Sequence, residues 1–131
     1  MWQKAHSLTL AIYRVSASFP AQKTYGLTSQ VRRSAASVPA NIAEGCGRDT
    51  AADLARFLQI AMGSASELEY HLLLARDLGF LNQGDYDDLG RETVRVKKML
   101  STYLSRPRSQ IRKPGADLRP PISDLRQPDV V

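Results

Sequence analysis

The sequence contains few of the residues that build disulfides, metal sites or membrane spans. It has one cysteine, Cys46, and two histidines, His6 and His71, among 131 residues. One cysteine excludes a disulfide within the chain, and the histidines stand on different predicted helices with no ligand cluster around them, so we predict no metal site. No run reaches the roughly 18 apolar residues of a membrane span, and the N-terminus lacks a signal-peptide core. We therefore expect a cytoplasmic protein without membrane association.

Groups that would carry catalysis are also missing from the sequence. There is no glycine-rich phosphate loop with its lysine, and the Glu-x-x-His pairs of di-iron bundles are absent. Glu67 and Glu69 are two residues apart and so do not share a helical face. Cys46 lies near a predicted helix C-terminus, where the helix dipole does not favour a thiolate. We predict that the protein is not an enzyme, with no catalytic residue and no cofactor.

The net charge of +5 suggests a nucleic-acid partner, but the charge is unevenly distributed. Residues 1–105 hold 12 Lys and Arg against 10 Asp and Glu, a balance of +2. Residues 106–131 hold 6 against 3, a balance of +3. Any nucleic-acid binding is therefore expected to be weak, not sequence-specific, and carried largely by the C-terminal segment.

Four stretches carry apolar residues at the three- and four-residue spacing of an amphipathic helix. Thr50 and Asp53 form a capping pattern before the third stretch, and Gly79 is expected in the left-handed conformation after it. No alternating β-type pattern competes, so residues 1–105 are predicted to form an all-α, antiparallel up-and-down four-helix bundle. The spacing predicts helices over residues 2–18, 27–46, 50–78 and 82–104. The expected core includes Leu8, Ile12, Val31, Val38, Leu58, Leu68, Val96 and Leu100.

Residues 106–131 differ in composition from the rest of the chain. They contain five of the seven prolines and no sustained apolar period. Proline removes a backbone donor and prevents a continuous helix. We predict that this basic, proline-rich tail is disordered.

The second predicted helix carries a polar stripe opposite its apolar face. A proline, Pro39, stands in the middle of this helix and predicts a kink or a restart of the helix. The stripe is either a solvated face with local ion pairs, such as Glu44 with Arg48, or a buried seam that fixes a contact within the bundle or between subunits. It consists of Ser29, Arg33, Ser37, Asn41, Glu44 and Arg48.

The third predicted helix carries a second apolar stripe, in addition to the stripe that is expected to face the core. Ile60 and Leu74 also fall outside the core face. Scattered apolar residues are common on protein surfaces, but recurrence at helical spacing on the longest helix favours a subunit interface. The candidate interface residues are Ala55, Met62, Ser66 and Leu73.

Residues 25–48 resemble the signature of the bacterial four-helix bundle family. This segment begins with Tyr-Gly-Leu-Thr-Ser-Gln and ends with Ala-Glu-Gly-Cys-Gly-Arg. This family is also called the 23S rRNA intervening-sequence protein family, because some members are encoded inside insertions in 23S rRNA genes. Segments 2–5, 57–58, 61–69 and 72–79 add to the resemblance. Cys46 departs from it, since an aromatic residue is usual there, and the proline-rich tail has no counterpart. The resemblance implies a homo-oligomeric bundle, pentameric in the family, without an established biochemical activity.

Two functions follow as hypotheses. The first is a homo-oligomeric structural or interaction protein that presents its helix faces and its basic tail to an unidentified protein partner. The second is an RNA- or DNA-binding protein, as in the distantly similar accessory proteins of diversity-generating retroelements. Binding that falls steeply with salt would support the second. Its candidate residues are Arg32, Arg33, Arg48, Arg106, Arg108, Arg112 and Lys113.

The tail is predicted to be dispensable for folding, because it offers no periodic apolar surface to bury. A chain that ends at Ser105 is expected to unfold at the same temperature as the full chain in a circular dichroism melt. A markedly lower unfolding temperature for the shortened chain would contradict this prediction.

Overall fold

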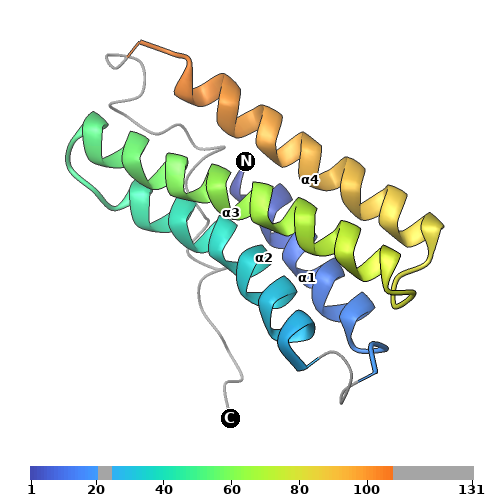
Figure 1. Cartoon of the computed structure of the whole chain (residues 1–131). Coiled ribbons are helices and arrows are strands. Elements are labelled where there is room, and N and C mark those ends of the chain that lie inside the picture. The colour runs from blue at the N-terminus through green and yellow to red at the C-terminus, as the bar shows by residue number, and fades with distance from the viewer. Residues whose placement is uncertain (21–24, 108–131) are drawn as a thin grey trace.

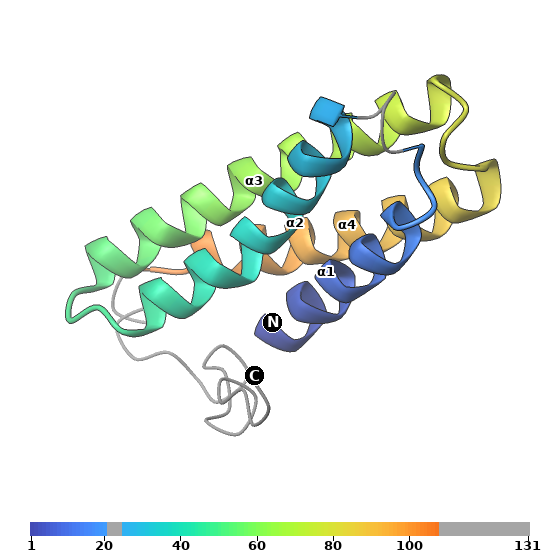
Figure 2. The ribbon, with the colours of Figure 1, turned by 90° about the horizontal axis from the view of Figure 1, so that it is seen from below.

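The structure, a computed structural model, describes residues 1–20 and 25–107. Consecutive helices run antiparallel and lie side by side, so the architecture is an up-and-down four-helix bundle, as the sequence predicted (Figures 1 and 2). Residues 108–131, most of the predicted tail, lie outside the described residues. No strand occurs in the described part of the chain. The helices are α1 (Trp2–Ser16), α2 (Tyr25–Cys46), α3 (Ala51–Asp77) and α4 (Gln83–Leu104).

The predicted helix ends are correct to within two residues. The capping hydroxyl of Thr50 accepts a hydrogen bond from the Asp53 backbone N–H at 3.1 Å. Gly79 has φ of +83°, the left-handed conformation expected after the third helix. Two boundaries were wrong by two residues, because α1 ends at Ser16 and α2 already begins at Tyr25. Local turn and capping geometry, which periodicity does not record, sets such ends.

The core lies between all four helices and contains the eight core residues named above. Phe57, which the periodicity also placed on the core stripe of the third helix, is only half-buried outside the core, with Arg48 and Arg56 over its ring. α1 has only 15 residues, against 22, 27 and 22 in the other helices. It therefore covers only part of the length of α2 and α3 (Figure 2). Beyond it, α2 and α3 approach each other closely near their connection. A Cβ on Gly45 would lie 3.0 Å from Leu54 Cδ1, so only glycine fits there without a shift of its neighbours.

Pro39 is buried inside α2, and the helix continues through it without a restart. Proline has no N–H, so it cannot donate to the carbonyl of Ala35, four residues earlier. The single hydroxyl proton of Thr9 on α1 is shared between two carbonyl oxygens, that of Ala5 on its own helix at 2.9 Å and that of Ala35 at 3.1 Å. A side chain of a neighbouring helix thus supplies the hydrogen bond that the proline removes.

Candidate functional site

The middle of the polar stripe on α2 faces α3. Ser37 Oγ lies 2.7 Å from Ser64 Oγ, and Asn41 Nδ2 donates to Ser37 Oγ at 3.0 Å. Arg33 forms an ion pair with Glu67, also on α3. These contacts form a polar seam between the two helices, in agreement with the interpretation of the stripe as a bundle contact.

The two ends of the stripe are exposed to solvent. Glu44 and Arg48 form the expected ion pair at 2.7 Å, and both side chains are about half exposed. The guanidinium of Arg48 also lies over the ring of Phe57, 4.8 Å from its centroid. Ser29, at the other end, is exposed. The stripe therefore combines both interpretations, with a seam in the middle and a solvated face at its ends.

A buried histidine, whose place in the seam was not predicted from the sequence, extends the seam. Ser34 Oγ on α2 lies 3.1 Å from His71 Nδ1 on α3, and neither residue is more than 8% exposed. On the other side of the ring, His71 Nε2 lies 3.9 Å from Glu67 Oε2. The spacing of Glu67 and His71, four residues apart, and of Ser34 and Ser37 could have suggested two facing polar rows. Because the neighbouring residues are apolar, the spacing of these polar residues was not recognised.

His71 can keep its hydrogen bond to Ser34 in either protonation state. Burial lowers the pKa of His71 below its ordinary value of 6.5, the Glu67 carboxylate raises it, and Arg33 lowers it again. In the neutral ring, Nδ1 can accept the Ser34 proton while Nε2–H faces Glu67. In the protonated ring, Nδ1–H donates to Ser34 Oγ, which can then donate to the Gln30 carbonyl at 3.0 Å. Both states keep their hydrogen bonds, and the neutral one avoids a buried charge.

Those of the cations proposed for nucleic-acid binding that the structure describes have partners within the chain. Arg32 donates to Ser16 Oγ at 2.7 Å and lies over the ring of Tyr13. Arg33 and Arg48 form the ion pairs described above. Arg106 lies over the Tyr103 ring, and Arg108, Arg112 and Lys113 lie outside the described residues. The described candidates thus each have a partner within the chain, while the side chains of Arg33 and Arg48 remain 52% and 42% exposed.

The candidate interface residues on α3 are less accessible than expected. Ala55, Met62 and Leu73 are half-buried, and Met62 packs against the core. Ser66 is exposed. The exposed large apolar residues of α3 are Ile60, which is 42% exposed, and Tyr70, which is 58% exposed. Of these two, the sequence analysis identified Ile60 and missed Tyr70.

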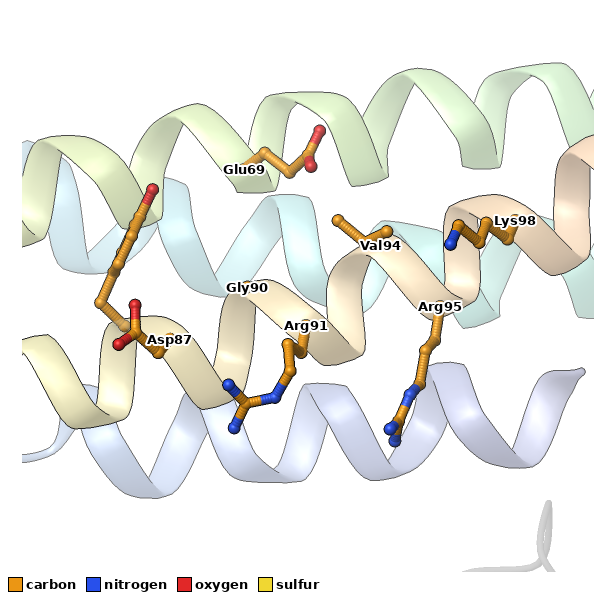
Figure 3. A pocket seen from close by; sticks show the side chains of 8 residues that line it. Glu69, Asp87, Gly90, Arg91, Val94, Arg95 and Lys98 are labelled. Carbon is orange, nitrogen blue, oxygen red and sulfur yellow. The ribbon is translucent and has the colours of Figure 1, made fainter.

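A groove runs between α3 and α4 on the outside of the bundle (Figure 3). Its larger part is a cavity of about 510 Å³, and a neighbouring part of about 310 Å³ adds Met62, Lys97 and Ser101. Lys97 and Glu69 form an ion pair across it at 2.6 Å. The larger part is lined by Glu69, Tyr86, Asp87, Gly90, Arg91, Val94, Arg95 and Lys98.

In the described ranges, no three His, Cys, Asp or Glu side chains lie close enough together to hold a metal ion. None of the described helices combines the length and apolar character that crossing a membrane requires.

Residues 1–102 match the family model described as 23S rRNA-intervening sequence protein. Among solved structures, the chain is similar to a protein with unknown function from the S23 ribosomal protein family of Bacteroides thetaiotaomicron. The TM-score is 0.73 and the identity 25%, over 80% of this chain and 98% of that chain. A comparison with curated proteins gives no match.

The buried His71 predicts that stability falls in mild acid. Folding lowers the pKa of His71, so the unfolded chain binds the proton more readily than the folded chain. The contribution of the neutral His71 ring to the free energy of unfolding is therefore complete above pH 6.5. It is lost as the pH falls through the pKa of the folded state. Urea unfolding between about pH 5 and 7.5 should show this loss, and His71→Gln should remove it. His6→Gln is the matched control, since His6 lies on α1 and stacks on Trp2. An unchanged pH profile in His71→Gln would refute the prediction.

Proposed function

Because the chain belongs to the 23S rRNA-intervening sequence protein family, we propose that it acts as a non-enzymatic, homo-oligomeric bundle with a structural or interaction role. The resemblance described for residues 25–48 implies a pentamer. In this proposal the protein works in the cytoplasm by presenting helix faces to copies of itself and to a protein partner. The observation that carries the proposal is the outer face of α3, the surface formed by Ile60, Gly63, Ser66 and Tyr70.

The outer face of α3 combines exposed apolar side chains with a glycine. Ile60 and Tyr70 lie three residues before and seven residues after Gly63, spacings that place all three on one side of the helix. A Cβ on Gly63 would meet no atom within 4 Å, so packing within the chain does not require a glycine there. Glycine inside a helix costs about 1 kcal/mol relative to alanine. A helix of another subunit that approaches closely would account for it.

Of the candidate residues from the sequence, only Ser66 belongs to this face. Ala55, Met62 and Leu73 are half-buried, and Met62 lines the groove between α3 and α4. A charge at Met62 would disturb the core as well as an interface, because Met62 packs against core residues. Tyr70 is therefore the better position for a test, since its side chain is more than half exposed.

Tyr70→Glu is expected to reduce the mass of the oligomer in light scattering at micromolar concentration, because it places a charge in an apolar contact. Helicity by circular dichroism should remain unchanged. Leu10→Glu is the matched control, because Leu10 is 44% exposed on α1, away from this face, and its substitution should leave the mass unchanged. A wild-type chain with the mass of a monomer would refute the proposed assembly. A wild-type mass in Tyr70→Glu would refute the interface.

A further inference from the structure

Acidic residues are absent from the first third of the chain. Residues 1–43 contain five Lys or Arg and no Asp or Glu, a balance of +5. Residues 44–105 hold 7 Lys and Arg against 10 Asp and Glu, a balance of −3. All of α1 and most of α2 belong to the basic part, and α3 and α4 belong to the acidic part. The small net charge of the bundle therefore conceals two parts of opposite sign.

The ion pairs sharpen this separation of charge. Seven Lys and Arg side chains in residues 1–20 and 25–107 pair with a carboxylate, and none of these pairs includes a residue of α1. Five others have no carboxylate partner in these ranges, so their charge is not neutralised there. We call these five cations the α1 basic surface, because each lies on α1 or beside it. They are Lys4, Arg14, Arg32, Lys98 and Arg106.

The α1 basic surface extends along most of α1. Lys4 and Arg14 are exposed on α1, ten residues or about 15 Å apart along the helix axis. Arg32 reaches α1 from α2, because its guanidinium donates to Ser16 Oγ at 2.7 Å and to the Tyr13 carbonyl at 3.2 Å. Both acceptors are neutral, so Arg32 is held in place while it keeps its full charge.

The surface continues where α1 begins and α4 ends. Lys98 and Arg106 are exposed there, and together with Met1 they line a cavity of about 230 Å³. No acidic residue follows Glu92 in the described part of the chain, and Glu92 itself pairs with Arg95. Positive charge therefore extends from α1 onto the last part of α4.

Tyr13 places an aromatic ring within this basic surface. Its side chain is 44% exposed, and the guanidinium of Arg32 lies over the ring, 4.8 Å from its centroid. Proteins that bind single-stranded nucleic acid without sequence preference combine cations along the backbone with aromatic rings on which bases stack. Arginine beside such a ring adds a cation–π contribution to the stacking.

We propose that single-stranded nucleic acid binds along the α1 basic surface, with its phosphates on the cations and a base stacked on Tyr13. Cations without carboxylate partners attract any polyanion, whereas the exposed ring favours one that presents flat bases. A duplex keeps its bases stacked on each other, so it cannot use this ring. The surface does not include the outer face of α3, so the proposal does not rest on the proposed assembly.

The test is a titration of the full chain with a fluorescent, unstructured single-stranded RNA at several salt concentrations, followed by anisotropy. Lys4→Gln with Arg14→Gln removes two proposed phosphate contacts, so the affinity should fall at least about fivefold. The slope of log K against log salt should become shallower by about 1.4, which is 0.7 for each contact. Arg56→Gln with Arg91→Gln is the matched control, because both arginines are exposed and pair with carboxylates. Equal losses in the two variants would overturn the proposal.

The basic tail requires its own control in the same titration. Arg112→Gln with Lys113→Gln removes the same charge from the tail and is expected to weaken binding less than the pair of substitutions on α1. A loss in this tail variant as large as the loss from Lys4→Gln with Arg14→Gln would overturn the proposal.

Tyr13→Leu separates base stacking from phosphate contacts. It should weaken RNA binding at least about fivefold and leave the salt slope unchanged, because stacking neutralises no phosphate. Arg32 keeps its acceptors, since the Tyr13 carbonyl and Ser16 remain. Helicity by circular dichroism should stay the same. An unchanged affinity, or binding of polyglutamate or of duplex as tight as that of the single strand, would contradict the proposal.

Discussion

The arrangement of the bundle depends on a proline buried in the middle of α2. Pro39 leaves the carbonyl of Ala35 without its helical donor, and an unpaired buried carbonyl would cost about 1–3 kcal/mol. Thr9 supplies the missing donor from α1. This hydrogen bond fixes the register of α1 against α2, because only one residue of α1 occupies the required position. A local defect in one helix thus becomes a specific contact between two.

Polar contacts hold α2 on its other side as well. Ser34 contacts His71 and Ser37 contacts Ser64, so the seam with α3 is formed mainly by short side chains that allow a close approach. Gly45 continues this close approach toward the connection between the two helices. α2 directs its most specific polar contacts toward α1 and α3, and its cations Arg32 and Arg33 take part in these contacts. Exposed large apolar side chains remain for partners on α1, α3 and α4.

Periodicity was sufficient to predict the number of helices, their order and the core, because an amphipathic stripe is a local property of the sequence. It could not assign the polar stripe on α2, since the same residues suit a solvated face and a seam. Ser34 and His71 were missed because burial depends on the neighbouring helix. Met62 was predicted as an interface residue because a helical wheel does not show how far α4 covers α3. Tyr70 and Gly63 became candidates only once the structure showed what lies around them.

The link between Thr9 and Pro39 is tested most directly by a double-mutant cycle on the free energy of unfolding, measured with urea. Thr9→Val removes the hydroxyl and keeps the shape of the side chain. Its expected cost is about 1–3 kcal/mol in the wild-type chain, because the Ala35 carbonyl loses its donor. In a Pro39→Ala background, the introduced alanine supplies a backbone N–H to the same carbonyl, so the cost should fall by at least about 0.5 kcal/mol. An equal cost of Thr9→Val in both backgrounds would contradict the account.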